Sequence, residues 1–235
     1  MPRTSIIVPV LDEAATVETS LRCLAPFRQA GAEVIVVDGG SRDGTVAIAT
    51  PHADRVLRGP RGRDSQMNAG AAAAQGDILV FLHADTRLPG SADRIVRDAL
   101  NAPGGRTRRV WGRFDVTIEG KSPLLGLVAA LMNARSRATG IATGDQAMFA
   151  TRAAFICAGG FPDIPLMEDI ELSRRLKRIS APVCLAARVS TSGRRWESRG
   201  VVRTILLMWR LRLAHFFGTA PDRLARQYGY VPRQS

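Results

Sequence analysis

The sequence contains few cysteines, few aromatic residues and no long apolar run. Its three cysteines, Cys23, Cys157 and Cys184, lie far apart and outside any C-x-x-C spacing, which excludes a disulfide framework and favours a reduced, cytoplasmic setting. No uncharged apolar run reaches the roughly 18 residues of a bilayer-spanning helix. The N-terminal apolar run at residues 6–11 contains a proline and is too short for a signal peptide, so we expect no targeting segment.

Lysine is nearly absent, although the chain is strongly basic. Lys and Arg number 33 against 21 Asp and Glu, a formal net charge of +12, and only Lys121 and Lys177 are lysines. Such a surplus of arginine attracts polyanions, namely nucleic acids, acidic membrane surfaces and phosphate-bearing substrates. A bias toward arginine without any specific role explains it equally well. The excess is concentrated after residue 187, where ten arginines accompany only two acids.

The first hundred residues alternate between two patterns. Hydrophobic residues make up 46% and charged residues 23% of the 235 residues, as expected of one large globular domain. Short apolar runs predict strands at 5–10, 33–37, 54–58 and 77–82, and helical patterns follow at 13–29, 44–50, 65–75 and 91–100. Continuous apolar strands separated by helices predict an α/β fold with a mostly parallel central sheet flanked by helices.

The second half of the sequence is less regular. It predicts strands at 110–118, 145–151 and 183–187, a helix at 168–179, an apolar stretch at 124–132, a turn at 102–108 and a loop at 159–167. We therefore expect one sheet-based domain over residues 1–198, with halves at 1–101 and 102–198. A basic, apolar helical extension over 199–235 would follow it.

Acidic residues follow three of the expected strands. They are Asp12 and Glu13 after the first strand, Asp38 after the second, and the His83-Ala84-Asp85 segment after the fourth. Each acid taken singly is explained by capping of the next helix. Ligands of open parallel sheets bind beyond the carboxyl ends of the strands, however, so three such ends predict a rim of carboxylates suited to a ribose, a base N–H and a divalent cation.

Two loops at this rim suit phosphate-bearing ligands. The loop G-G-S-R-D-G-T after Asp38 includes Gly40, and its glycines allow the backbone to approach a ligand closely. Arg63 and two further arginines precede Asn68, and the arginine fork binds two phosphate oxygens at once. Neither the dinucleotide fingerprint G-x-G-x-x-G nor the phosphate loop G-x-x-x-x-G-K-[ST] is present.

Four motifs in order resemble those of the family 2 glycosyltransferases. They are S-I-I-V-P-V-L-D-E-A, V-V-D-G-G-S-R-D-G-T, N-A-G-A-A-A-A-Q-G-D-I-L-V-F-L-H-A-D-T and G-G-F-P-D-I-P-L-M-E-D-I-E-L-S-R-R-L, and the likeness spans residues 5–226. F-L-H-A-D-T together with S-G-R-R-W is similar to a bacterial subgroup named for an association with arsenosugar biosynthesis. The resemblance implies the A-type glycosyltransferase fold, a hexosyltransferase-like activity, a nucleoside-diphosphate sugar donor and Mn²⁺ or Mg²⁺.

The resemblance also implies roles for the residues that match each motif. Asp85 matches the last acid of the metal-binding Asp-x-Asp motif, and Asp169 matches the catalytic base. Gly160 and Glu168 match the acceptor loop and the start of the Glu-Asp motif. The implied contacts of the nucleotide sugar are Pro9, Asp12, Glu13, Asp38, Gly40, Arg63, Asn68, His83, Ala84, Asp85, Arg195 and Trp196.

Two positions depart from the family pattern. Asp12 replaces the usual Asn, and His83 replaces the first carboxylate of the Asp-x-Asp motif. Asp85 and the phosphates of the donor would still hold the ion, because Mg²⁺ keeps several waters and borrows substrate oxygens. His83 is a ligand, a residue that orients a ligand, or a donor to a ribose oxygen, and we favour the last two.

The expected mechanism requires a carboxylate opposite the leaving group. The acceptor hydroxyl loses its proton as it attacks, and Asp169 would take it in an in-line attack that inverts the anomeric centre. Glu168, Asp169 and the nearby Glu171 are explained equally well as acids that interact with the dipole of the expected helix.

The C-terminal segment at 200–218 is mostly apolar and basic. At helical spacing Arg199, Arg203 and Arg210 share one face, while Arg212 points the other way. The helix would either lie in an anionic membrane interface, as a peripheral protein at the inner face of the membrane with a lipid-linked or amphiphilic acceptor, or pack on the sheet with its arginines reaching water. Alternatively, Arg194 and Arg195 would contact the donor pyrophosphate.

Two other functions compete with glycosyl transfer. A sugar nucleotidyltransferase would have its glycine-rich loop after the first strand, where P-V-L-D-E-A stands. A nucleic-acid-binding module would explain the charge of +12, but aromatic residues make up only 6% of the chain and are scattered. We therefore expect no nucleic-acid partner.

Overall fold

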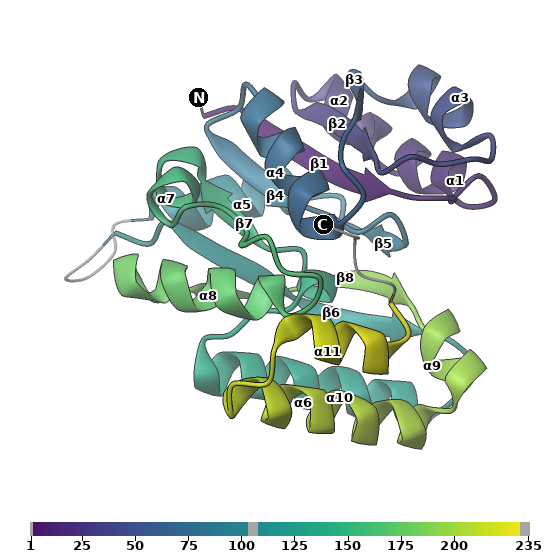
Figure 1. Ribbon diagram of the computed structural model, residues 1–235. Helices are drawn as coiled ribbons and strands as arrows, with labels where there is room; N and C mark the ends of the chain where they lie inside the picture. The colour runs from purple at the N-terminus through teal and green to yellow at the C-terminus, as the bar shows by residue number, and fades with distance from the viewer. Residues whose placement is uncertain (1, 103–107, 231–235) are drawn as a thin grey trace.

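The computed structural model describes residues 2–102 and 108–230, and an eight-stranded mixed sheet forms its centre (Figure 1). In spatial order the strands are β3 (Arg55–Arg58), β2 (Glu33–Asp38), β1 (Thr4–Val10), β4 (Ile78–Phe81), β7 (Phe149–Thr151), β6 (Trp111–Glu119), β8 (Val183–Ser192) and β5 (Thr86–Arg87). The first four are parallel to one another, β7 runs antiparallel to β4 and β6, β8 is parallel to β6, and β5 is antiparallel to β8. The expected α/β fold is confirmed.

Helices cover both faces of this sheet. Because successive strand residues point to opposite faces, Ile6 and Val8 of β1 pack in one hydrophobic cluster and Ile7 in the other. The first cluster includes residues of α1 (Val17–Arg22), α2 (Ala25–Gln29), α3 (Thr45–Ala49), α5 (Ala92–Asn101) and α6 (Leu124–Thr139). The second includes residues of α4 (Arg63–Ala73), α7 (Arg152–Cys157) and α8 (Glu168–Ile179). β1, β2 and β4 are therefore buried on both faces, which explains their continuous apolar runs.

Several predicted elements differ in detail. The helix expected at 13–29 is broken into α1 and α2 around Leu24, just before Pro26 near the start of α2. The strand expected at 145–151 is confirmed only from Phe149, because Gly144–Gln146 forms a 3₁₀ turn closed by a capping box from Thr143. Most of the turn expected at 102–108 lies outside the described residues.

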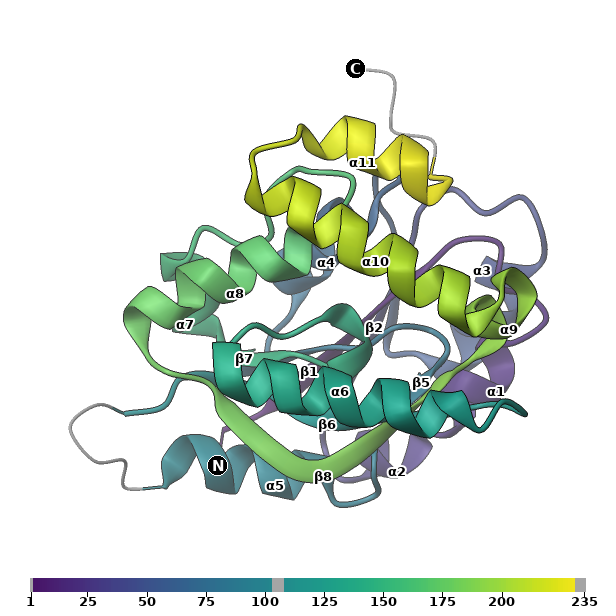
Figure 2. The same cartoon turned by 90° about the horizontal axis from the view of Figure 1, so that it is seen from below.

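The chain ends in three helices that lie beneath the sheet, as Figure 2 shows. They are α9 (Arg194–Arg199), α10 (Val201–Phe216) and α11 (Pro221–Tyr228). Leu211 of α10 and Leu224 of α11 pack with Met167 and Ile170, so this region is attached at the N-terminal end of α8. The expected helical C-terminal region is confirmed, whereas the domain boundaries at 101 and 198 stay predictions. Among the described residues, no helix has the length and apolar character needed to cross a bilayer.

Candidate active site

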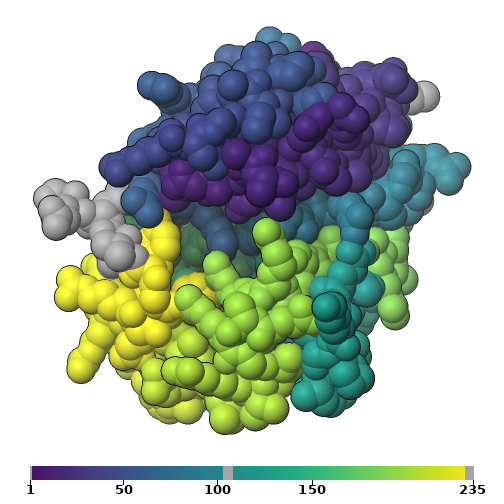
Figure 3. All heavy atoms as spheres, turned by 90° about the vertical axis from the view of Figure 1, so that its right-hand side faces the viewer, coloured from purple at the N-terminus to yellow at the C-terminus, as the bar shows by residue number. Residues whose placement is uncertain are grey.

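A cleft separates the N-terminal half of the sheet from the C-terminal helices, and Figure 3 shows its mouth between the purple and the yellow-green segments. It contains a large cavity of about 370 Å³ and a small cavity of about 150 Å³. The two adjoin, because they share the lining residues Arg63, His83, Asp85, Leu166, Glu168, Arg195 and Tyr228. Cavities of this size at the carboxyl ends of parallel strands are typical ligand sites.

The ends of β1 and β4 form one wall of the large cavity. Pro9 and Glu13 line it after β1, and His83, Ala84 and Asp85 line it after β4. Gln66 of α4, which the sequence motifs did not single out, donates its amide N–H groups to the carbonyl oxygens of Val10 and Val37 at 2.8 and 2.7 Å. Gln66 thereby fixes the ends of β1 and β2 relative to α4.

Three predicted rim residues stay outside both cavities. The Asp38 carboxylate is 1% exposed and accepts hydrogen bonds from the backbone N–H groups of Gly40 and Ser41. The exposed Asp12 carboxylate accepts one from the Arg42 N–H at 2.8 Å. Gly40 has a φ of +95°, which suits glycine, at the turn that these bonds hold. In this structure the two carboxylates stabilise the loop 39–43. Neither of the two cavities contains Asp38 together with Asp85 and Asp169.

Asn68 and Gly160 also lie outside both cavities. The Asn68 amide exchanges two hydrogen bonds with the backbone of Phe161, at 2.8 and 2.9 Å. A side chain at Gly160 would collide with the Asn68 oxygen, since an added Cβ would lie 2.8 Å from it. Asn68 therefore ties α4 to the loop that leads into α8, and this contact helps to position Glu168.

The N-terminal end of α8 brings two acids to the cleft. Glu168 lines both cavities and is 8% exposed, and burial together with the neighbouring Asp169 carboxylate raises its pKa to about 8. Glu168 therefore carries its proton at neutral pH. Asp169 lines the small cavity, and its carboxylate accepts hydrogen bonds from the N–H groups of Gly144 and Ile170 at 2.9 and 2.7 Å.

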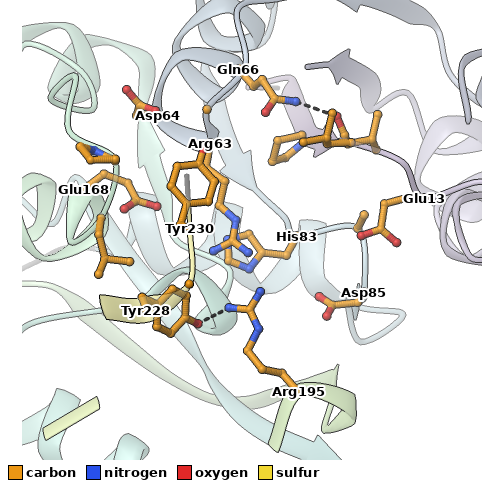
Figure 4. A pocket seen from close by; sticks show the side chains of 18 of the residues that line it. Glu13, Arg63, Asp64, Gln66, His83, Asp85, Glu168, Arg195, Tyr228 and Tyr230 are labelled. Atoms are coloured by element: carbon orange, nitrogen blue, oxygen red, sulfur yellow. Dashed lines mark hydrogen bonds between the residues drawn. The ribbon is translucent and has the colours of Figure 1, made fainter. Parts of the chain in front are cut away.

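Arg63 begins α4 and points into the space between acids from both sides of the cleft (Figure 4). Enclosure by the cleft walls would lower the pKa of Arg63. At the high pH at which Arg63 would release its proton, Glu168, Tyr228, Asp145 and Asp85 are all ionised, and their charges outweigh this effect and raise the pKa. Arg63 therefore stays charged and available to a second anion.

Asp145 is a cleft residue that the sequence motifs missed. It lies 3.3 Å from the Nδ1 of His83, in the 3₁₀ turn before β7. Burial would raise the pKa of Asp145, but the hydrogen bond and charge of His83 outweigh it and lower the pKa. The sequence signal was the Gly-Asp pair after Thr143, which is unusual for a strand.

The C-terminal helices form the opposite wall. Arg194, Arg195 and Arg199 line the large cavity, and Trp196 lines the small one. The Arg195 guanidinium lies 4.9 Å from the centre of the Tyr228 ring and donates a hydrogen bond to the tyrosine hydroxyl. Tyr228 lies near the C-terminus of α11, and no motif pointed to it.

A divalent cation fits this site only if the ligand supplies most of its oxygens. Among the described residues no group of three or more His, Cys, Asp or Glu side chains is arranged to hold a metal ion. The exposed Asp85 carboxylate has one long contact, 3.5 Å from the Thr86 hydroxyl, while His83 is engaged with Asp145. One available carboxylate beside a cavity rich in arginine suits Mg²⁺ or Mn²⁺ that is shared with phosphate oxygens.

Residues 5–105 match the family model described as glycosyl transferase family 2. Among curated proteins, a PGL/p-HBAD biosynthesis glycosyltransferase of Mycobacterium bovis is 37% identical over 105 residues, which cover 42% of this chain and 41% of that protein. A TPR repeat-containing protein of Synechococcus elongatus is 38% identical over 105 residues, or 44% of this chain and 25% of that protein. The chain thus spans between a quarter and two fifths of the length of these relatives.

Several solved structures share the fold. Glucosyl-3-phosphoglycerate synthase from Mycobacterium tuberculosis, in complex with Mn²⁺, UDP and glucosyl-3-phosphoglycerate, aligns with a TM-score of 0.57 and 18% identity over 81% of this chain and 71% of that one. TarS 1–349 of S. aureus aligns with a TM-score of 0.62 and 16% identity over 81% and 60%. The likeness to family 2 is therefore confirmed for the N-terminal half, and the expected fold for most of the chain.

Proposed function

We propose that the chain is an inverting, hexosyltransferase-like glycosyltransferase that moves a sugar from a nucleoside-diphosphate sugar to an acceptor hydroxyl. The observation that carries this proposal is the cleft itself, in which Arg63, Asp85 and Arg195 line both cavities and Asp169 lines the small one. The family match over residues 5–105 and the UDP complexes of structurally similar enzymes support the choice of donor class. The arsenosugar subgroup stays a prediction.

The large cavity is the proposed donor site. A nucleoside diphosphate carries negative charge that Arg63, Arg194 and Arg195 would meet, and arginine binds phosphate oxygens in pairs. Glu13 and His83 line the same space and provide hydrogen-bonding groups for a ribose or sugar hydroxyl. The Asp38 carboxylate would contact the nucleobase of the donor only if its hydrogen bonds with the loop 39–43 were broken.

Asp85 is the proposed protein ligand of the cation, with the donor phosphates as the others. When bound, Mg²⁺ or Mn²⁺ would neutralise the negative charge that develops on the departing diphosphate. Arg63 and Arg195 would stabilise the same charge from the opposite walls of the cleft.

Asp169 is the proposed general base. Two backbone N–H groups hold its carboxylate at the small cavity, where an acceptor hydroxyl could donate its proton while it attacks the sugar carbon in line. Glu168 is protonated at neutral pH and therefore unsuited to act as the base. Its carboxyl group would instead donate a hydrogen bond to the acceptor or the sugar.

A second surface favours an anionic membrane as a partner. The helices α6 and α10 lie alongside one another (Figure 2) and expose large apolar side chains: Leu124, Leu127 and Leu131 on α6, and Val202, Leu206, Trp209, Leu213 and Phe216 on α10. Residues 120–144 and 198–221 contain no Asp or Glu, whereas Arg203 and Arg210 are exposed on α10. Apolar bulk with cations and no anions suits the interface of an anionic bilayer, so we infer peripheral binding.

A donor panel tests the proposed function. Binding of UDP, GDP and dTDP is measured by calorimetry with Mn²⁺ and with EDTA, followed by hydrolysis of the corresponding nucleotide sugars. We expect metal-dependent binding of one diphosphate and slow release of its sugar. Salt-sensitive binding of DNA, with no affinity for any diphosphate, would instead support the nucleic-acid alternative.

A further inference from the structure

Unpaired polar atoms gather where α6 meets α10. Among the described residues, six buried side-chain nitrogen or oxygen atoms have no hydrogen-bond partner. Five of them belong to these two helices: Arg135 Nε and Nη2, Ser136 Oγ, Arg212 Nε and His215 Nε2. Buried polar groups without partners are rare in folded proteins, so a cluster of five needs an explanation.

The two arginines of this cluster form no ion pair. Within the described part of the chain, neither Arg135 nor Arg212 has a carboxylate within ion-pair distance. Burial, with the nearby charge of Arg212, lowers the pKa of Arg135 to about 10, and burial outweighs the charges of Asp169 and Asp145 and lowers the pKa of Arg212. Two half-buried cations that repel each other would both gain from a bound anion.

The cluster adjoins the proposed acceptor side of the cleft. Thr204, Met208 and Arg212 recur every four residues on α10 and all line the small cavity, as Asp169 does. The charge of Asp169 acts on Arg212, but the two groups form no ion pair, because hydrogen bonds hold the Asp169 carboxylate on the backbone of Gly144 and Ile170. Arg212 lines the small cavity but not the large one, which separates it from the arginines assigned to the donor.

We propose that Arg135 and Arg212 bind an anionic group of the acceptor, a phosphate or carboxylate, and so present the acceptor hydroxyl to Asp169. The arginine N–H groups can only donate hydrogen bonds, and the Ser136 hydroxyl and His215 imidazole can also donate, which suits an acceptor-rich anion. This inference rests on the proposed function and adds the substrate class: a hydroxyl compound that carries a negative charge.

The test replaces each arginine by the uncharged Met and uses inorganic phosphate as the probe. Arg212→Met and Arg135→Met are compared with Arg210→Met, whose side chain lies exposed on the same helix as Arg212. Without phosphate we expect Arg135→Met and Arg212→Met to melt at or above the wild-type temperature, because a half-buried charge without an ion-pair partner is removed. Phosphate should raise the melting temperature of wild type and Arg210→Met, with affinity at least about tenfold weaker in Arg135→Met and Arg212→Met.

Calorimetry with the nucleoside diphosphate that the donor panel selects, in the presence of Mg²⁺, separates this inference from the proposed function. We expect Arg212→Met to bind the diphosphate within about twofold of wild type, since the arginine lies outside the donor site. An equal loss of diphosphate and phosphate affinity would assign both arginines to the donor and overturn the inference. Absence of any phosphate effect on wild type would also overturn it, whereas failure of wild type to bind any diphosphate counts against the proposed function.

Two probes distinguish a soluble from a lipid source of the anion. Glycerol 3-phosphate should displace inorganic phosphate if the acceptor is soluble, and phosphatidic acid vesicles, but not phosphatidylcholine vesicles, should do so if it is a lipid. In either case the displacement should weaken in Arg212→Met. It should persist in Arg94→Met, which alters an exposed arginine of α5 outside both cavities and outside the proposed membrane-binding face. If neither phosphate ester competes, the assignment of an anionic acceptor group is wrong.

Discussion

The two walls of the cleft differ in how strongly the chain itself determines them. The sheet wall comes from β1 and β4, which are buried on both faces and followed at once by the residues that line the large cavity. The helical wall comes from α8 to α11, whose cleft residues lie far apart in sequence, from Glu168 to Tyr230. The positions of the cleft residues in the sheet wall follow from the local sequence pattern. Those in the helical wall depend on how the helices pack against the rest of the protein.

The two walls also carry groups with different proposed functions. The sheet wall carries Arg63 and Asp85, the groups proposed for a diphosphate and its cation, and it is the part that matches the family model. The helical wall carries Asp169 and Arg212, the groups proposed for the acceptor. A shared donor chemistry on one wall and a variable acceptor chemistry on the other would allow one fold to serve many substrates.

The largest effect is expected on the helical wall. Asp169→Asn keeps the side chain's shape but removes the proton acceptor, so transfer should fall by roughly 10²–10⁴-fold. Donor affinity should change little, because Asp169 does not line the large cavity. Single-turnover rates with the donor and an accepted hydroxyl compound measure the fall in transfer. Calorimetry measures the donor affinity. Wild-type turnover in Asp169→Asn would refute the base assignment.

The next effect is expected on the sheet wall. Asp85→Ala should weaken diphosphate binding by roughly tenfold or more with Mn²⁺, and should have much less effect with EDTA, because the carboxylate acts through the cation. Asp98→Ala, a substitution on α5 outside both cavities, is the matched control. Equal losses with and without metal would mean that Asp85 contacts the donor directly.

Most of the sheet wall could be predicted from the sequence. Runs such as Ile6–Ile7–Val8 specify buried strands, and the residues after a parallel strand reach the ligand edge in any such sheet. The roles expected of Asp38 and Asn68 stay predictions, because position at the rim does not determine where a side chain points. Asp38 turns into its own loop, and Asn68 turns toward Phe161.

The helical wall was predicted only in part. The motif around Asp169 placed it at a helix N-terminus, as the structure has it. Tyr228 carried no local signal that distinguishes a cleft residue from a surface one. Its position depends on α10 and α11 folding back over the cleft, which the hydrophobic contacts of Leu211 and Leu224 determine. Such long-range packing is difficult to recognise from the spacing of residues in the sequence or from its composition.

A third prediction concerns the outer face of the helical wall. Trp209→Ser combined with Leu206→Ser should weaken binding to vesicles that contain anionic lipid by roughly tenfold, because two large apolar side chains no longer enter the interface. Hydrolysis of a soluble donor should stay unchanged. Ile156→Ser, which alters an exposed apolar residue on α7, is the control. Vesicle sedimentation measures the effect, and undiminished binding of the double variant would exclude this face as the contact.

A smaller effect is expected where the C-terminal helices hold an arginine over the donor site. Tyr228→Phe keeps the ring against Arg195 but removes the hydroxyl that the guanidinium contacts, so diphosphate affinity should fall by about threefold. Tyr228→Ala also removes the ring on which the Arg195 guanidinium stacks, so its diphosphate affinity should fall further. Calorimetry with the selected diphosphate measures both. Equal affinities in the two variants and wild type would mean that Arg195 is positioned without α11.

The smallest effect is expected on the helical wall, at Glu168. Its folded pKa of about 8 is above the ordinary value of 4.5, so between these pH values the folded state binds a proton that the unfolded state has released. Stability must therefore fall as pH rises through this window, and this loss disappears in Glu168→Gln. The melting temperature of Glu168→Gln relative to wild type should rise between pH 5 and pH 8, by about 2–4 °C for each kcal/mol of stability that the wild type loses. Glu171→Gln, one turn further along α8, should show no such trend, and a pH-independent difference for Glu168→Gln would mean that the carboxyl is already ionised near neutral pH.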